Sequence, residues 1–318
     1  MSAPILVIGS FIQDLTFFVE RFPAAGETIL GRFVTGPGGK GSNQATAAAR
    51  AGAKTAFVGA VGNDSFGECA ERFLAVEGIE AHLLRIPSAA TGTAGITVNA
   101  AGQNQIVVAL GASENFQSSQ INMELFKAAK IVVLQLEIHF QTVVNALRLA
   151  RDLGKTTILN PAPMSPAFDF SVLTNVDIFI PNETEFVSVV QRHPFLANPG
   201  FTEEQLNSLS PAELHALCRK LCVATVIVTL GKRGCFISQE NRFELVPACA
   251  GITAVDTTGA GDAFVGGFAA GLIEFEGDVV RAAHRGNVVA GLSVTKHGTA
   301  PSMPKRAEIE TYLAAQCL

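Results

Sequence analysis

Short apolar runs alternate with helical segments along most of this chain, and the alternation constrains the fold more than any other feature. Each run is continuous and apolar, as expected for a strand buried on both faces. The expected strands are 5–9, 55–61, 131–136, 156–159, 178–181 and 225–230, and the expected helices are 42–52, 66–77, 139–153, 260–273 and 279–293. Strands that alternate with helices form parallel βαβ units, which place helices on both faces of one sheet. The sequence therefore predicts an α/β fold.

Two regions interrupt this alternation with strands that have no helix between them. Strand-like runs at 15–19 and 28–34 flank a turn, and runs at 94–98 and 105–109 are joined by a hairpin-like connection. We expect these four strands to form a small sheet separate from the main one. Another irregular segment, 193–211, contains several Pro and Asn residues and is expected to be a surface excursion between elements.

Composition limits the classes of protein to which the chain can belong. Hydrophobic residues make up 48% of the 318 residues and charged residues 16%, which suffices for a large buried core. No linker or shift in composition divides the chain, so residues 1–318 are expected to form one domain. No stretch reaches the roughly 18 apolar residues that cross a bilayer, and the N-terminus lacks the features of a signal peptide. The sequence predicts a soluble, cytoplasmic protein with no membrane partner.

Charge and cysteine content argue against two further classes. The formal net charge is −5 and no basic stripe is visible, so no nucleic-acid partner is expected. The six cysteines form no C-x-x-C pair and no spacing typical of zinc ligands. They are expected to be structural thiols.

The segment DTTGAGDAF at 256–264 carries the strongest local indication of chemistry. Gly259 and Gly261 allow backbone N–H groups to converge at the N-terminus of the following helix, which favours the binding of an anion. Asp262 lies in the first turn of that helix, where a carboxylate can accept the proton of a hydroxyl that attacks a bound phosphoryl group. The alternative is that the helix dipole alone favours an acid at this position. The local sequence does not decide between the two.

The glycine-rich segment GPGGKG at 36–41 formally matches G-x-G-x-x-G, a pattern of low specificity. It does not follow the first long strand, as a dinucleotide fingerprint does, and the pattern G-x-x-x-x-G-K-[ST] is absent. We interpret the segment as a loop of exposed N–H groups in which Lys40 and Asn43 can hydrogen-bond a polyhydroxyl ligand. The alternative is a tight turn capped by Ser42.

The segment PNETE at 181–185 comes at the carboxyl end of an expected strand, where ligands bind in open α/β sheets. Asn182 and Glu185 lie on one face of the next helix, from which they can hold Mg²⁺ largely through water. The alternative is a capping box with Asn182 as N-cap and Glu185 as its partner. Taken alone, the segment favours the capping box.

Together these segments resemble the ribokinase-like (PfkB) sugar kinase family, and the resemblance spans nearly the whole chain. The runs GPGGKGSNQATAAARAGAKTAFVGAVGNDSFG and DTTGAGDAFVGGFAAG are similar to its two signatures, and PNETE is similar to its N-x-x-E magnesium motif. The segments LQLE at 134–137, NPAP at 160–163, TLG at 229–231 and SVTKHGTAPSMP narrow the resemblance to pentose kinases. The resemblance implies a three-layer α/β/α core with a mostly parallel central sheet and a small β-sheet lid. The lid would comprise about residues 12–36 and 91–110 and would form a homodimer contact.

The resemblance also implies roles for individual residues. ATP would donate the phosphate, with Asp262 as the catalytic base and the backbone of Thr258, Gly259, Ala260 and Gly261 as the anion hole. The residues implied at the sugar are Asp14, Gly39, Lys40, Asn43 and Glu137. The residues implied at ATP and at a Mg²⁺ held through water are Asn182, Glu185, Thr229, Gly231 and Asn287. The residues implied at an activating K⁺, held largely by carbonyl groups, are Asp256, Thr258, Ser293, Lys296, Gly298 and Ser302.

Ile12 departs from the pattern of the family's ribose kinases, which carry Asn there in the run G-S-x-N-x-D. The family's deoxyribose kinases carry an apolar residue at this position. Ile12 cannot hydrogen-bond a 2-hydroxyl but packs well against a C2 methylene, and burying an unpaired hydroxyl costs about 1–3 kcal/mol. Ribose should therefore lose roughly 5- to 150-fold in kcat/KM. The alternative is that Ile12 only packs in the core and that ribose is recognised elsewhere.

The sequence thus predicts an ATP-dependent kinase that phosphorylates the 5-hydroxyl of a pentose, with 2-deoxy-D-ribose favoured. D-ribose is the alternative substrate, followed by other sugars or nucleosides of the same family. Two other classes stay open: a dinucleotide-dependent oxidoreductase, which the misplaced glycine segment disfavours, and a non-catalytic sugar-binding protein of the same fold.

Overall fold

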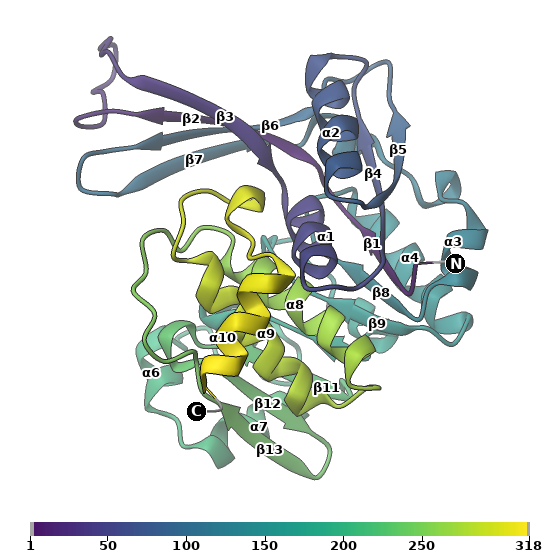
Figure 1. The fold of residues 1–318 in the computed structure, drawn as a ribbon. Coiled ribbons are helices and arrows are strands. Elements are labelled where there is room, and N and C mark those ends of the chain that lie inside the picture. The colour runs from purple at the N-terminus through teal and green to yellow at the C-terminus, as the bar shows by residue number, and fades with distance from the viewer. Residues whose placement is uncertain (1–2, 317–318) are drawn as a thin grey trace.

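A nine-stranded sheet forms the centre of the computed structural model, which describes residues 3–316 (Figure 1). Its strands are β1 (Ile5–Ile8), β4 (Thr55–Val61), β5 (Glu80–Arg85), β8 (Ile131–Leu134), β9 (Thr156–Leu159), β10 (Ile178–Phe179), β11 (Thr225–Thr229), β12 (Cys235–Gln239) and β13 (Arg242–Val246). They lie in the order β13-β12-β11-β10-β9-β8-β1-β4-β5. The pairs from β5 to β11 are parallel, and β12 pairs antiparallel with β11 and β13.

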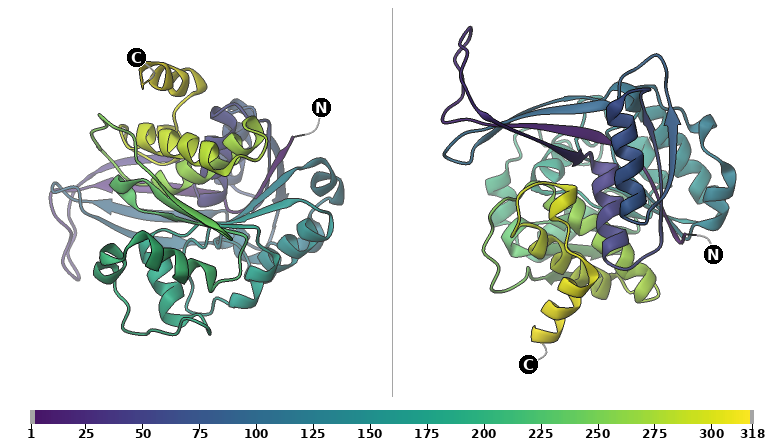
Figure 2. Two further views of the ribbon diagram at one scale, coloured as in Figure 1. Left: turned by 90° about the horizontal axis from the view of Figure 1, so that it is seen from below. Right: turned by 45° about the horizontal axis from the view of Figure 1, so that its top comes forward.

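Helices cover both faces of this sheet, as the left view of Figure 2 shows. One layer contains α1 (Lys40–Arg50), α2 (Ser65–Val76), α8 (Ala260–Glu274) and α9 (Val279–Ser293), with α10 (Arg306–Gln316) packed against α9. The other layer contains α3 (Met123–Ala128), α4 (Phe140–Asp152), α5 (Glu183–Arg192), α6 (Glu203–Ser208) and α7 (Pro211–Arg219). Within the part of the chain that the structure describes, no helix combines the length and apolar character needed to span a bilayer.

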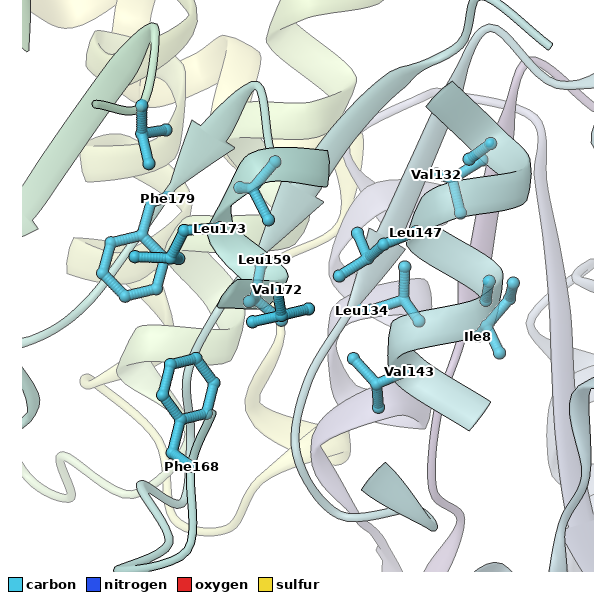
Figure 3. Close-up of a cluster of buried hydrophobic side chains, with 14 of the residues drawn as sticks. Ile8, Val132, Leu134, Val143, Leu147, Leu159, Phe168, Val172, Leu173 and Phe179 are labelled. Atoms are coloured by element: carbon cyan, nitrogen blue, oxygen red, sulfur yellow. The ribbon is translucent and has the colours of Figure 1, made fainter. Parts of the chain in front are cut away.

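Alternate side chains of the buried strands pack against opposite helix layers. In β1, Ile5 and Val7 belong to the cluster that contains residues of α8 and α9, whereas Leu6 and Ile8 belong to the cluster beneath α4 and α5. Figure 3 shows part of the second cluster, in which Ile8 lies near side chains of β8 and α4. Burial on both faces fixes the sheet rigidly, so the loops at the carboxyl ends of its strands start from fixed positions.

A separate sheet of four strands projects from one end of the molecule, at the upper left of Figure 1. Its strands, in spatial order, are β3 (Arg32–Gly38), β2 (Ile12–Phe18), β6 (Gly92–Val98) and β7 (Asn104–Ala109). β2 pairs antiparallel with β3 and parallel with β6, and β6 and β7 form a hairpin. All residues of β7 are exposed, and the rings of Phe17 and Phe33 lie 5.1 Å apart on the surface. This small sheet buries little of itself within the described chain.

The predicted fold class is confirmed, because the mostly parallel sheet, the two helix layers and the small sheet are all present. The predicted limits of several strands differ from those observed: β2 covers Ile12–Phe18 rather than 15–19, and β3 differs most from its predicted range of 28–34. β3 begins at Arg32 and continues through Gly38, so Gly36 and Gly38 are strand residues rather than part of a loop. The register explains this difference, since Gly38 pairs with Ile12 and Gly36 with Asp14. A Cβ at Gly38 would collide with the Asp14 carboxylate, whereas a Cβ at Gly36 would meet no atom within 4 Å.

Several elements were absent from the prediction. β5 and β13 carry mostly exposed or half-buried residues, so neither has the continuous apolar run of a central strand. β12 and α10 were also missed. The segment 193–211 is not a plain excursion, because it contains α6, which begins with a capping box between Thr202 and Gln205.

Candidate active site

Gly259 and Asp262 mark the N-terminus of α8. Gly259 is the N-cap, with a φ of 79° in the left-handed region that glycine adopts without strain. No side chain of residues 3–316 caps this helix end, and a Cβ at Gly261 would meet no atom within 4 Å. The free N–H groups of a helix N-terminus attract anions, and here they adjoin open space. Asp262 lies in the first turn and is buried.

Two side chains of α1 hold the carboxylate of Asp262. Asn43 donates from Nδ2 to Oδ2 at 3.0 Å, and Gln44 donates from Nε2 to Oδ1 at 2.9 Å. The two helices can approach closely because Gly266 of α8 faces the backbone of Gln44, where a Cβ would not fit. Both oxygens of Asp262 are therefore fixed in orientation, which a group that accepts a proton from a bound substrate requires.

Gln44 is the centre of a buried amide network that the sequence analysis missed. Its Oε1 accepts from Nε2 of Gln135 at 2.6 Å, and its Nε2 also lies 3.1 Å from Oδ1 of Asn160. Asn160 in turn donates to the carbonyl of Ile180 at 2.8 Å. Gln135 and Asn160 directly follow β8 and β9. The strand-end argument that identified Asn182 could therefore have found them as well.

A cavity of about 210 Å³ lies beside the N-terminus of α8. It is lined by Lys40, Asn160, Ala162, Ile180, Asn182, Glu185, Thr229, Thr257, Gly259, Ala260, Gly261, Asp262 and Val265. The structure thus brings together the predicted residues of three separate sequence motifs around one space. A larger hollow of about 410 Å³ lies near the N-terminus of α4, and none of the predicted site residues lines it.

Lys40, the first residue of α1, is a cation among carboxylates. Burial lowers the pKa of its ammonium group, but the nearby carboxylates of Asp262, Glu137 and Glu185 outweigh this and raise the pKa above its ordinary value. The backbone N–H of Lys40 donates to Oε2 of Glu137 at 2.9 Å, and Ser10 Oγ donates to the same oxygen at 2.6 Å. Lys40 therefore remains charged and available for an anionic or hydroxyl group in the cavity.

Asn182 and Glu185 form the capping box that the sequence left as an alternative. Asn182 Oδ1 accepts from the N–H of Glu185 at 2.8 Å, and Glu185 Oε2 accepts from the N–H of Asn182 at 2.9 Å. Both residues also line the cavity, so capping does not remove them from the site. Burial raises the pKa of Glu185, although the Asn182 N–H and Lys40 oppose it.

Ile12 and Asp14 lie two residues apart on β2 and so share one face of the small sheet. Asp14 Oδ2 accepts from Oγ1 of Thr299 at 3.0 Å. Burial raises the pKa of Asp14 to about 6; the Thr299 hydrogen bond opposes this, and Glu137 and Asp262 reinforce it. Ile12 is only 2% exposed.

Gly39, with a φ of 93°, passes directly beside Ile12, because a Cβ there would lie 2.6 Å from the Ile12 nitrogen. A neighbouring buried atom marks where a ligand would complete the site. Asn43 Oδ1 has no hydrogen-bond partner within residues 3–316, although its Nδ2 is used by Asp262. A buried acceptor without a partner carries a desolvation cost that a ligand hydroxyl can remove.

The residues predicted for a monovalent cation lie in two neighbouring segments: Asp256 and Thr258 precede α8, and the others extend from Ser293, the last residue of α9, to Ser302 in a short 3₁₀ helix. Asp256 joins the segments, since its Oδ1 accepts from the Thr258 N–H at 2.9 Å and its Oδ2 from the Gly298 N–H at 3.0 Å. Burial raises the pKa of Asp256, but these N–H groups outweigh it and the pKa is lowered. The hydroxyls of Ser293 and Ser302 donate to backbone carbonyls, and Lys296 Nζ pairs with Glu308 at 2.5 Å.

Three further predicted residues differ in their relation to the cavity. Thr229, at the end of β11, lines it and bridges to Asn182. Gly231 follows with a φ of 51° and is not a lining residue. Asn287 is buried away from the lining, and its Nδ2 donates to the carbonyls of Val246 and Pro247 at 3.1 and 2.9 Å. Across residues 3–316, no group of three or more His, Cys, Asp or Glu side chains is arranged to hold a metal ion.

Comparisons with known proteins agree on one family. The family model described as pfkB family carbohydrate kinase matches residues 2–306. The chain is 34% identical to a ribokinase of Haemophilus influenzae, over 98% of this chain and 99% of that protein. It is also 34% identical to a deoxyribokinase of Salmonella typhi, over 98% of each. The solved structure of Arabidopsis thaliana ribokinase complexed with ribose and ATP superposes with a TM-score of 0.86 at 30% identity, covering 98% of this chain and 99% of that one.

These matches extend over nearly the full length of both partners, and the predicted resemblance is confirmed. Because this ribokinase and this deoxyribokinase are equally similar to the chain, overall identity does not separate the two sugars. The chain belongs to the pfkB family of carbohydrate kinases and is a phosphotransferase that acts on an alcohol group.

Proposed function

We propose that this kinase transfers the γ-phosphate of ATP to the 5-hydroxyl of a pentose and that 2-deoxy-D-ribose is its preferred substrate. The choice of sugar rests on one observation above all: Ile12, an apolar residue, shares a face of β2 with Asp14, the carboxylate proposed to bind the sugar. An apolar side chain there favours a C2 methylene over a C2 hydroxyl. D-ribose is the alternative, since an apolar pocket excludes one added hydroxyl only weakly.

In the proposed reaction, Asp262 accepts the proton of the 5-hydroxyl as its oxygen attacks the terminal phosphorus. Asn43 and Gln44 keep the carboxylate turned toward the cavity. The N–H groups of Gly259 and Gly261 stabilise the negative charge on the phosphoryl oxygens, since they lie at an uncapped helix N-terminus. The N–H groups of Thr258 and Ala260, also expected in the anion hole, donate to Asp256 Oδ1 at 2.9 Å and to the Thr257 carbonyl at 3.2 Å. Lys40 adds a positive charge at the same cavity.

The nucleotide is proposed to occupy the side of the cavity formed by β10, β11 and α8. A related ribokinase was solved with ribose and ATP, which supports ATP as the phosphate donor here. Thr229 lies at the cavity wall and Gly231 two residues further along the chain, so both can lie beside the phosphates of the bound nucleotide. We propose that Asn287 lies on the adenine side. Its side-chain amide would act indirectly, by fixing through its hydrogen bonds the backbone of residues 246–247.

Mg²⁺ fits this site when held through water. Glu185 offers a buried carboxylate at the cavity, and hard cations such as Mg²⁺ prefer oxygen ligands and retain waters. Asn182 fixes that carboxylate through the capping box. Bound there with the phosphates, Mg²⁺ would neutralise part of their charge.

K⁺ fits the pair of segments joined by Asp256. The two segments run side by side, with the N–H groups of Val255 and Asp256 both donating to the Val294 carbonyl. We propose that carbonyls and hydroxyls of this pair, including Thr258, Ser293, Lys296, Gly298 and Ser302, hold the ion. The ionised Asp256 would balance its charge.

We further propose that residues 1–318 form one kinase domain, that the small sheet is its lid, and that the lid pairs with a second copy of the chain. The exposed apolar side chains of the small sheet support this, among them Phe33 and Val107, which are 51% and 75% exposed. β3 and β7 are open edges. Exposed apolar strands with free edges favour association with a partner.

The first experiment is a comparison of kcat/KM for 2-deoxy-D-ribose and D-ribose, measured by ADP release with Mg²⁺ and K⁺ present. A clear preference for 2-deoxy-D-ribose supports the proposal. Equal rates or a preference for ribose mean that Ile12 does not face C2 and that the protein acts as a ribokinase. If neither sugar releases ADP, the pentose assignment is wrong, and hexoses and nucleosides should be assayed next.

A further inference from the structure

Thr299 is a hydroxyl residue at the base of the small sheet to which no role has been assigned. It precedes the short 3₁₀ helix η5 (Ala300–Ser302). Its Oγ1 lies 3.0 Å from Oδ2 of Asp14 on β2 and 3.3 Å from the carbonyl oxygen of Pro37 on β3. A threonine hydroxyl has one proton to donate. The carboxylate of Asp14 is nearer than the Pro37 carbonyl and is the stronger acceptor, so the hydroxyl donates to Asp14.

Asp14 needs such a donor because of what surrounds it. The charged groups that face it are Glu137, after β8, and Asp262, in α8, and both are acidic. Together with burial, these two carboxylates raise the pKa of Asp14 and so favour its protonated form. The hydrogen bond from Thr299 lowers the pKa and favours the ionised form. A carboxyl group accepts a hydrogen bond from a sugar hydroxyl best when it is ionised, because protonation turns one of its acceptor sites into a donor. The change between protonated and ionised Asp14, with a pKa of about 6, therefore falls close to physiological pH.

We propose that Thr299 is a positioning residue for the sugar: by donating to Oδ2 of Asp14 it fixes the orientation and charge of that carboxylate and leaves Oδ1 for the substrate. This inference rests on the proposed function, in which Asp14 binds the pentose. Thr299 does not itself touch the reacting atoms.

Thr299 also lies next to the N-terminus of α8, on the phosphate side of the site. A Cβ at Gly259 would lie 3.4 Å from the Cα of Thr299, so the residue adjoins the N-terminus of α8. The preceding residue, Gly298, donates its N–H to Asp256. Thr299 thus connects β2 and β3 of the small sheet to the loop beside the phosphate site, through one side chain.

The test uses three variants of the full-length protein. Thr299→Val removes the hydroxyl at nearly constant volume, Thr299→Ser keeps it, and Thr311→Val is the matched control on α10, where the hydroxyl donates only to the Ala307 carbonyl. The Kd of 2-deoxy-D-ribose and of D-ribose is measured by calorimetry, and kcat/KM is measured from pH 5.5 to 8.5.

We expect Thr299→Val to weaken binding of the preferred pentose roughly tenfold at pH 7, as loss of a hydrogen bond to a charged group implies. The loss in kcat/KM should be larger at pH 6 and smaller at pH 8.5. Without the Thr299 hydroxyl the pKa of Asp14 rises, so the fall of kcat/KM on the acid side of its pH profile moves to higher pH. Thr299→Ser should have nearly the Kd and the pH profile of kcat/KM of the wild type, and Thr311→Val should match the wild type in both.

A Thr299→Val protein with wild-type Kd and pH profile overturns the inference, as does a Thr299→Ser protein as defective as Thr299→Val, since then the methyl group and not the hydroxyl matters. If the wild type neither binds nor phosphorylates any pentose, the proposed function itself is wrong and the inference falls with it. The wild-type measurement therefore separates the two failures.

Discussion

Asn43, in the first turn of α1, donates a hydrogen bond of 3.0 Å to Oδ2 of Asp262, which lies 219 residues further along the chain in the first turn of α8. The same amide keeps its Oδ1 without a partner among the described residues. One side chain thus orients the proposed base with one atom and offers the substrate an acceptor with the other. The sugar side and the phosphate side of the site share this residue.

Replacing Asp262 with Asn should remove the proton acceptor while preserving the shape of the site. We expect kcat to fall by about 10²- to 10⁴-fold, the range typical of general base catalysis. The Kd of the sugar, measured by calorimetry, should change little. Turnover close to that of the wild type would show that Asp262 is not the base.

Replacing Ile12 with Asn should shift selectivity toward ribose. The Asn amide can pair with a 2-hydroxyl, so the ratio of kcat/KM for D-ribose to that for 2-deoxy-D-ribose should rise by roughly 5- to 150-fold. Ile12→Val, which stays apolar, is the control and should keep the wild-type ratio. An unchanged ratio in Ile12→Asn would mean that this side chain only packs in the core, as its 2% exposure would also allow.

Replacing Glu185 with Gln separates the two roles of this residue. Gln can still accept from the Asn182 N–H, so the capping box and the Tm should persist. Loss of the charge should raise the Mg²⁺ concentration for half-maximal rate roughly tenfold. A variant with a lower Tm and an unaltered Mg²⁺ dependence would limit Glu185 to capping.

The raised pKa of Asp14, about 6, has a consequence for stability. Between pH 3.8 and 6 the unfolded chain releases this proton while the folded chain retains it, so the group lowers the free energy of unfolding as pH rises and adds no further change above that window. Asp14→Asn should therefore be more stable than the wild type at pH 7, by roughly 3 kcal/mol, and about equally stable near pH 3.5.

Urea unfolding at several pH values measures the effect of Asp14→Asn, and the same variant should bind sugar poorly. Equal stability of the two proteins at pH 7 would contradict the raised pKa.

Replacing Val107 with Asp should disrupt the proposed dimer. The side chain is 75% exposed on β7, so a charge there costs the isolated chain little but would be buried between two small sheets. We expect sedimentation velocity to show dimers for the wild type and monomers for the variant. Val76→Asp, on α2 and 84% exposed, is the control and should remain dimeric. A monomeric wild type would refute the dimer itself.

The parts of the fold that the sequence predicted are those with continuous apolar runs, such as β1 and β4, because burial on both faces leaves a local pattern. β13 was missed because it is short and its apolar residues alternate with Arg242 and Glu244 instead of forming a continuous run, although it pairs with β12. The limits of β3 were wrong because Gly36 and Gly38 were interpreted as a loop, and only their pairing with β2 reveals a strand. The oxidoreductase alternative, which depended on that loop, is wrong for a carbohydrate kinase.

Within the site, the sequence identified residues that belong to contiguous motifs and missed those that act across the fold. Lys40, Glu185 and Asp262 line one cavity as predicted neighbours of a ligand, although their roles stay proposals. Gln44 contacts Asp262 across 218 positions, and Thr299 contacts Asp14 across 285. No spacing rule connects positions so far apart, since the contact depends on how two helices or a loop and a strand pack.

A single residue, Gly39, separates the last residue of β3 from the first residue of α1. Its φ of 93° lies in a region that glycine adopts without strain, and a Cβ at this position would lie 2.6 Å from the Ile12 nitrogen, so a side chain does not fit there. The small sheet and the helix whose first turn holds Asp262 are therefore connected through one residue that only glycine can occupy. A substitution that changes the tilt of the small sheet should for this reason alter kcat even though it lies far from Asp262.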